Sequence, residues 1–131
     1  MIGLDTNVIV RALLNDDEVQ SAKAREVLNG LGEDRPGYVS VATFLELEWV
    51  LRSTGDMPRE RVADALQSLL ETTALRVQHM TQVALAVRAY RGGADFADAL
   101  IVGLCDMEGC ERVVTFDARA ARRIEGMELI A

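Results

Sequence analysis

The start of the chain places a short apolar segment, an aspartate and a helix in direct succession. Met1 to Leu4 are too few for a helix and suit a buried strand. The apolar residues that follow recur at helical spacing: Val8, Ile9, Ala12 and Leu13. Asp5 and Thr6 lie at the junction, and both are preferred N-cap residues. A strand that ends in Asp and turns into a helix places that carboxylate where open α/β folds bind ligands, although a helix cap worth about 1 kcal/mol explains Asp5 equally well.

The same alternation of short strands and helices continues along the chain. Further strands are predicted at Tyr38–Val41, Leu75–Val77, Arg112–Phe116 and Met127–Ile130. Helices are predicted at Asp16–Leu31, Ala42–Ser53, Arg59–Glu71, a segment capped by Thr81 that runs through Tyr90, Asp95–Glu108 and Ala118–Ile124. Such alternation predicts a three-layer α/β/α sandwich with a short central parallel sheet. With 131 residues and no linker or repeat, residues 1–131 are expected to form a single domain.

Composition narrows the function classes. The net charge of −7 argues against a protein that coats nucleic acid through bulk charge, but it permits metal binding or a local nucleic-acid patch. The longest apolar run, Ala99 to Cys105, is far shorter than a membrane span, and no secretory signal is recognisable. Cys105 and Cys110 are expected to be reduced thiols, because C-x4-C without a nearby His is a poor zinc signal. We therefore expect a cytoplasmic protein without membrane association.

Four acidic residues are candidate functional residues, and two of them follow predicted strands. Asp5 follows the first strand and Asp117 follows the Val113–Val114 strand, so both are expected at the same edge of a parallel sheet. The third, Glu46, has Ala42, Trp49 and Val50 as its helical neighbours, which predicts that it lies on an apolar face. An unpaired carboxylate on a packed face needs a metal, a hydrogen-bond partner or a raised pKa. Glu48, by contrast, is expected to form an ordinary surface pair with Arg52.

The fourth acid, Asp98, has Ile101 and Val102 at i+3 and i+4, again on an apolar face. A helix start explains it equally well, with Asp95 as the N-cap and Asp98 as a first-turn acid. Three Asp and one Glu at one sheet edge would repel one another, and hard divalent cations relieve that repulsion. All-oxygen ligands favour Mg²⁺ or Mn²⁺. The only histidine, His79, offers little support for a His-based triad or zinc site.

These motifs together resemble the acidic signature of PIN domains, and most closely that of VapC-type toxins from bacterial type II toxin–antitoxin pairs. The segments that carry the resemblance are Asp5-Thr6-Asn7, Glu46-Leu47, Asp95 to Leu100 and Thr115-Phe116-Asp117. The resemblance implies a PIN-like α/β/α fold and a Mg²⁺-dependent endoribonuclease that cleaves structured RNA such as tRNA or rRNA. It also implies a homodimer and a cognate, VapB-like antitoxin that blocks the active site. The positions carried over are Asp5, Glu46, Asp98 and Asp117, with Asn7, Thr115 and Asp95 as polar support.

The expected chemistry is metal-assisted phosphodiester hydrolysis, with Asp5 and Asp98 as the principal ligands and the other two acids completing the cluster. Candidate phosphate contacts are Arg11, Arg52, Arg88, Arg91, Arg119, Arg122 and Arg123, although solvated helix faces explain each one singly. A non-catalytic PIN-like module that binds RNA or protein is the main alternative. A receiver-like or phosphatase-like domain is a weaker one, because Asp5-Thr6-Asn7 lacks a second Asp two residues after the first.

Overall fold

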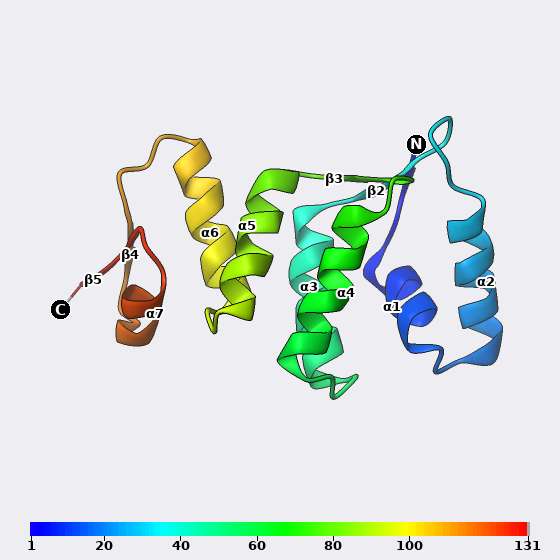
Figure 1. Cartoon of the computed structure of the whole chain (residues 1–131), viewed down its shortest axis with the longest axis horizontal. Helices are drawn as coiled ribbons and strands as arrows, with labels where there is room; N and C mark the ends of the chain where they lie inside the picture. Colours follow the sequence, from blue (N-terminus) through cyan, green and yellow to red (C-terminus); the bar gives the residue numbers. More distant parts are fainter. Residues whose placement is uncertain (131) are drawn as a thin grey trace. The chain divides into compact units, whose positions relative to one another are not determined.

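The computed structural model describes residues 1–130, which contain seven helices and five short strands (Figure 1). The chain divides into two compact units. The N-terminal unit comprises residues 1–79, and the C-terminal unit begins at Met80. In both units helices separate the strands, and every strand pairing is parallel. The predicted α/β fold class with short parallel strands is confirmed.

The N-terminal unit contains a three-stranded sheet in the order β1-β2-β3. Its strands are β1 (Ile2–Gly3), β2 (Gly37–Val39) and β3 (Leu75–Val77). Gly37 of the central strand pairs with Ile2 on one side and with Leu75 on the other. A Cβ atom at Gly37 would lie 2.8 Å from the side chains of Leu31 and Leu75, so a larger residue there would force both leucine side chains to move.

Four helices complete this unit: α1 (Thr6–Leu14), α2 (Glu18–Asn29), α3 (Val41–Ser53) and α4 (Arg59–Glu71). Helix α1 packs against α2 and α3, and α3 packs against α4. The core combines strand and helix side chains that are almost inaccessible to solvent, among them Leu4, Ile9, Val39, Phe44, Leu47, Leu51 and Leu66. This core fixes the end of β1 and the start of α1 in place, which is where Asp5 lies.

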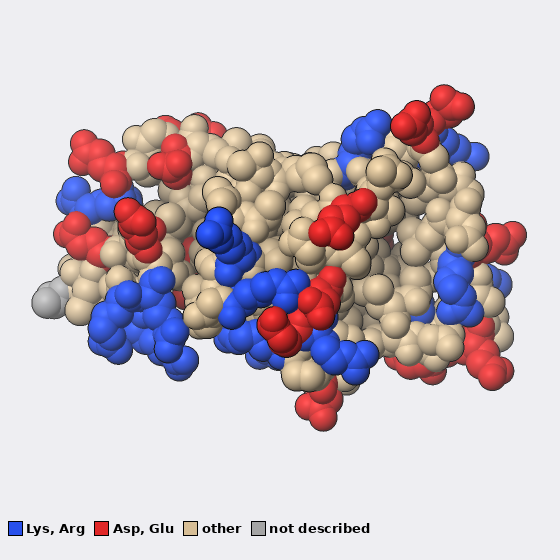
Figure 2. Space-filling model, viewed as in Figure 1, with Lys and Arg blue, Asp and Glu red and all other residues tan. Residues whose placement is uncertain are grey.

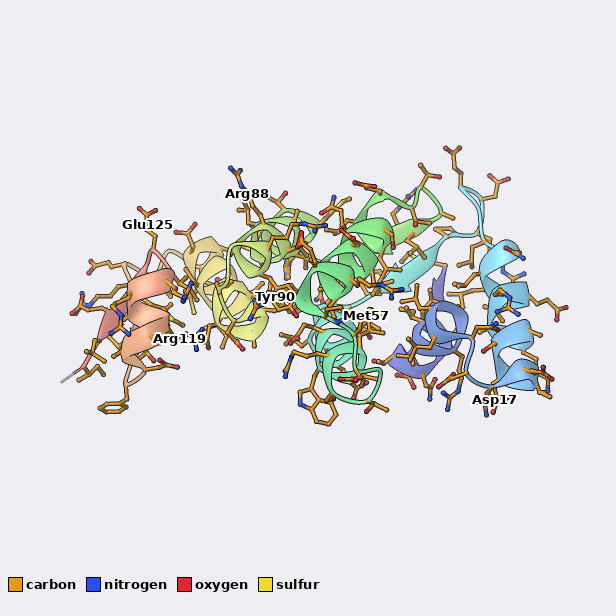
Figure 3. All side chains as sticks on the ribbon, turned by 60° about the horizontal axis from the view of Figure 1, so that its bottom comes forward. Asp17, Met57, Arg88, Tyr90, Arg119 and Glu125 are labelled. Carbon is orange, nitrogen blue, oxygen red and sulfur yellow. The ribbon has the colours of Figure 1, made fainter. Side chains whose placement is uncertain are left out.

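The C-terminal unit consists of α5 (Met80–Arg91), α6 (Phe96–Met107), β4 (Val113–Thr115), α7 (Ala118–Arg123) and β5 (Met127–Leu129). Helices α5 and α6 form an antiparallel hairpin, in which the rings of Tyr90 and Phe96 meet edge to face at 6.1 Å (Figure 3 labels Tyr90). Gly93, between the two helices, has a φ of +109°, a conformation that favours glycine. Strand β4 pairs with β5 only, among the described residues.

Two predicted helix starts are wrong. The helix predicted at 16–31 is observed at Glu18–Asn29. It begins later because Asp17 is its N-cap and accepts a hydrogen bond from the amide of Gln20 at 3.0 Å. Thr81 does not cap α5, because that helix already begins at Met80. The other predicted elements lie within about two residues of their observed bounds, and α4 matches its prediction.

No helix in the described part of the chain combines the length and the apolar character that a membrane span requires.

Candidate functional site

Asp5 ends β1 and caps α1. Its extended backbone (φ −80°, ψ 156°) leads into the helix, and its Oδ1 accepts a hydrogen bond from the amide of Thr6 at 2.8 Å. Thr6 is buried, whereas Asp5 is exposed. The cap therefore orients the carboxylate at the carboxyl end of β1 while Oδ2 accepts no hydrogen bond from another described residue. Sequence reasoning offered a helix cap and a ligand as alternatives for Asp5, and its two oxygens allow both roles.

A pocket of about 440 Å³ lies beside this cap, and four of the predicted site residues line it: Asp5, Asn7, Arg11 and Glu46. Asp5 and Asn7 come from the start of α1, and Glu46 comes from α3, which packs against α1. Two of the predicted carboxylates, 41 positions apart in the sequence, thus face one cavity of the N-terminal unit. A third acid that the sequence analysis did not single out, Asp16, also lines the cavity and pairs with Arg11 at 3.0 Å. The amide of Asn7 adds a neutral group that can donate or accept a hydrogen bond there.

The prediction that Glu46 lies on a packed apolar face is wrong. Glu46 is exposed, and its neighbour Trp49 is 57% exposed. The buried acid of α3 is Glu48, which is 5% exposed and accepts a hydrogen bond from Nε of Arg52 at 2.7 Å. The expected surface pair is therefore a buried carboxylate held by a half-exposed guanidinium. Glu48 lies four residues after the buried Phe44 and so shares its face of α3, but no pattern in the sequence identifies Phe44 rather than Ala42 as the residue of the buried face.

In the C-terminal unit, Asp95 and Asp98 share the first turn of α6. Asp95 is the N-cap, and its Oδ1 accepts a hydrogen bond from the amide of Asp98 at 2.9 Å. Asp98 is half-buried. Burial raises the pKa of the Asp98 carboxyl above its ordinary value, and the negative charges of Asp95 and Asp117 raise it further. Asp98 and Asp117 are therefore close enough to repel each other.

Asp117 caps α7 at the end of β4. Its Oδ1 accepts hydrogen bonds from the amides of Arg119 at 2.9 Å and Ala120 at 3.0 Å. Its own amide donates to Oγ1 of Thr115 at 3.0 Å. Thr115 thus orients Asp117, as expected for a polar support. The strand, aspartate and helix that begin the chain are repeated here.

The acidic side chains form a pair in each unit. Among residues 1–130, no group of three or more His, Cys, Asp or Glu side chains is close enough together to hold a metal ion. Carboxylate oxygens are nevertheless the donors that Mg²⁺ and Mn²⁺ prefer, and the crowding of Asp98 shows that positive charge there would be stabilising. The donor chemistry of both pairs therefore fits a hard divalent cation.

The candidate arginines differ in the partners they have. Arg11 contacts Asp16 at 3.0 Å and Gln20 at 2.6 Å, and Arg52 binds Glu48, so both guanidinium groups already have protein acceptors. Arg88 and Arg91 are exposed on α5. Helix α7 carries three exposed arginines in six residues: Arg119, Arg122 and Arg123. The basic group on α7 is the most compact of these.

Residues 2–126 match the family model of the PIN domain. The chain belongs to the PIN domain family. PIN domains are generally nucleases and typically bind divalent metal ions, so the family resemblance found from the acidic motifs is confirmed at this level. A comparison with curated proteins found no significant match.

The match to the PIN domain extends across both compact units. Asp5 and Glu46 come from one unit of it, and Asp98 and Asp117 come from the other. That all four serve one site, and that residues 1–131 act as a single domain, remain predictions.

Proposed function

We propose that this PIN domain is a Mg²⁺-dependent endoribonuclease and the toxin component of a type II toxin–antitoxin pair of the VapC type. Its substrate is the phosphodiester backbone of a structured RNA such as tRNA or rRNA. Family membership supports nuclease chemistry, and the acidic motifs carry the resemblance to the toxins. Mn²⁺ can replace Mg²⁺, because both prefer carboxylate oxygens.

The crowding of Asp98 is the observation that supports this proposal most strongly. A half-buried carboxylate whose pKa is raised by burial and by the negative charges of Asp95 and Asp117 destabilises the folded protein when it is ionised, and no basic side chain is among the causes that set its pKa. Folded proteins keep such groups where function needs them. The corresponding pair in the N-terminal unit, Asp5 and Glu46, faces a pocket large enough for a cation and its waters.

In the proposed mechanism, Asp5 and Asp98 would be the principal ligands of the metal ion, and Glu46 and Asp117 would bind it directly or through water. A bound divalent cation supplies an activated water and neutralises charge on the transferring phosphoryl group. Asp95 fixes the first turn of α6 and thereby Asp98, while Thr115 fixes Asp117. Asn7 offers a hydrogen bond within the pocket, and the exposed arginines contact phosphates along the RNA.

The proposed toxin role implies two protein partners. A VapB-like antitoxin would cover the active site until it is degraded, and a second copy of the chain would complete a homodimer. Both partners follow from the toxin resemblance, and the cytoplasm is the proposed location.

Cleavage of RNA by the purified protein tests the proposal. We expect Mg²⁺ or Mn²⁺ to support endonucleolytic cleavage of total cellular RNA at discrete sites and EDTA to abolish it. Asp5→Asn and Asp98→Asn should each lower the cleavage rate by about 100-fold or more, because each removes a principal ligand. Matched controls are Glu26→Gln and Glu125→Gln, which neutralise exposed acids of the N-terminal and C-terminal units outside the site.

The same experiment separates catalysis from binding. Full cleavage by both aspartate variants would refute the proposed site. Metal-independent RNA binding without cleavage by the wild-type protein would instead support the alternative, a non-catalytic PIN-like module.

A further inference from the structure

Phe116 is the most exposed large apolar side chain of the described chain, with 82% of its surface accessible. The other two phenylalanines, Phe44 and Phe96, are completely buried. Phe116 lies in the short connection between β4 and α7, directly before Asp117. Val114, two residues earlier, is 53% exposed, as the two-residue period of a strand requires for side chains on the same face. An aromatic ring in solvent forgoes a large hydrophobic stabilisation, and one this exposed beside a predicted site residue is a candidate for binding.

The backbone on both sides of Phe116 is held by hydrogen bonds. The carbonyl of Thr115 accepts from the amide of Ile130 at 2.8 Å, and the hydroxyl of Thr115 accepts from the amide of Asp117 at 3.0 Å. Asp117 in turn accepts two backbone hydrogen bonds from the first turn of α7. The ring is therefore presented by an ordered turn, which lowers the entropy that a ligand must remove on binding.

The helix that follows this turn is basic. Arg119, Arg122 and Arg123 are exposed on α7, and none of them forms an ion pair with another described residue. Figure 2 shows basic side chains gathered over this helix, and Figure 3 labels Arg119 on it. We call Phe116 together with these three arginines the aromatic–basic surface.

This combination fits an unpaired nucleic-acid segment. Successive bases of a single strand stack on aromatic rings, while arginines bind the phosphates and stack on bases. Inside a duplex the base faces are already occupied by their neighbours, so an exposed ring has no face to bind. A hydrophobic protein partner would match Phe116 and Val114 but not three unpaired guanidinium groups.

We propose that Phe116 stacks on an unpaired RNA base next to the phosphodiester bond that is cleaved, with the α7 arginines on the neighbouring phosphates. This inference rests on the proposed endoribonuclease function and assigns Phe116 and the α7 arginines as the residues that hold the RNA at the position where it is cut. Phe116 directly precedes Asp117, so a base stacked on its ring would lie next to a predicted metal ligand.

Equilibrium binding to labelled RNA tests the aromatic–basic surface without catalysis. In EDTA, which prevents hydrolysis, Phe116→Ala should weaken binding to an unpaired oligonucleotide roughly 5- to 150-fold, the range for loss of one stacked base. Phe116→Tyr should keep the wild-type affinity, and all three proteins should bind the same sequence as a perfect duplex equally. Leu85→Ala is the matched control, because Leu85 is 57% exposed on α5 and should be neutral.

Fluorescence provides an independent readout. Trp49 is the only tryptophan, so Trp49→Phe combined with Phe116→Trp places a single indole at the proposed stacking position. We expect a solvent-exposed emission spectrum in the free protein and quenching when unpaired RNA is added. Blue-shifted emission in the free protein, as when another protein surface covers the ring, would overturn the proposal.

Unchanged affinity of Phe116→Ala for unpaired RNA would also overturn it. Both readouts concern binding in EDTA, so their failure is distinct from absence of Mg²⁺-dependent cleavage, which would refute the proposed enzyme instead.

Discussion

The two compact units contain the same local arrangement of strand, aspartate and helix, but they bury the strand to different extents. In each, a parallel strand ends in an aspartate that caps the next helix: Asp5 between β1 and α1, and Asp117 between β4 and α7. In the N-terminal unit the central strand β2 is buried at Gly37 and Val39. In the C-terminal unit the two-stranded sheet leaves Val114 and Leu129 exposed by 53% and 44%.

The difference shows which features are structural and which are candidates for binding. The N-terminal unit uses its large side chains to build a core around α1 and α3, and its exposed acids face a pocket. The C-terminal unit has its core between α5 and α6, whereas its sheet and α7 present an aromatic ring and arginines to solvent. Both units expose some large apolar side chains, but the most exposed of them, Phe116, lies next to a predicted site aspartate in the C-terminal unit.

The three phenylalanines give the largest expected contrast. Phe44→Ala in the N-terminal unit and Phe96→Ala in the C-terminal unit should each lower the free energy of unfolding by about 3–5 kcal/mol, because both rings are fully buried. Phe116→Ala should change it by less than about 0.5 kcal/mol, because its ring is in solvent. Urea unfolding followed by circular dichroism measures all three.

The same unfolding curves test whether the two units unfold together. A single transition that shifts in both Phe44→Ala and Phe96→Ala would support one cooperative domain over residues 1–131. Two transitions, each sensitive to only one variant, would contradict the single-domain prediction.

Loss of an ion pair should lower the free energy of unfolding less than loss of a buried phenylalanine ring, and the two units should differ by a smaller amount. Arg52→Ala in the N-terminal unit deprives the buried Glu48 carboxylate of a hydrogen bond and should cost about 1–3 kcal/mol. Arg112→Ala in the C-terminal unit should cost less than about 1 kcal/mol, because Arg112 and Glu128 are both more than half exposed. Equal losses in urea unfolding would show that burial of Glu48 does not strengthen its pair.

Removal of a helix cap in each unit should give a smaller difference in stability. Asp17→Ala removes the side-chain cap of α2 and should cost about 1 kcal/mol (Figure 3 labels Asp17). Asp95→Ala removes an equivalent cap from α6 but also a negative charge that destabilises ionised Asp98, so its cost should be smaller. A larger loss of thermal stability for Asp95→Ala than for Asp17→Ala would contradict the repulsion at α6.

The smallest expected effect is a gain in stability in the C-terminal unit. The raised pKa of Asp98 means that the folded protein holds this proton to a higher pH than the unfolded chain does. The free energy of unfolding therefore falls as the pH rises from the ordinary Asp value through the raised pKa. In EDTA at neutral pH, Asp98→Asn should melt slightly higher than the wild type, and the difference should vanish below about pH 3.5. A lower melting temperature at neutral pH would show that Asp98 is stabilising.

Much of the fold follows from local patterns in the sequence. Short β-rich segments bounded by helix caps predicted the strands, and α4 was placed from Arg59 to Glu71 because its apolar residues keep helical spacing. Helix starts were harder, since several neighbouring residues can cap. Asp16 and Asp17 have the same chemistry, and only the hydrogen bond from Gln20 to Asp17 decides between them.

The candidate site was less predictable than the fold. Asp5 and Asp117 could be identified because a strand end and a helix start restrict where a side chain can lie. Glu46 and Glu48 could not be distinguished reliably, because Ala42, Trp49 and Val50 are apolar in type yet largely or partly exposed. Tertiary packing of α3, which no local pattern specifies, decided which glutamate is buried.

Calorimetric titration with Mn²⁺ is the most direct test of whether the acids of both units serve one metal site. Wild-type protein, Asp5→Asn and Asp98→Asn would be compared at neutral pH, with circular dichroism to confirm that each is folded. We predict one class of site in the wild type, weakened about tenfold or more by either substitution, because each removes a ligand from the same ion. Wild-type Mn²⁺ affinity in Asp5→Asn, alongside weakened binding in Asp98→Asn, would contradict a shared site.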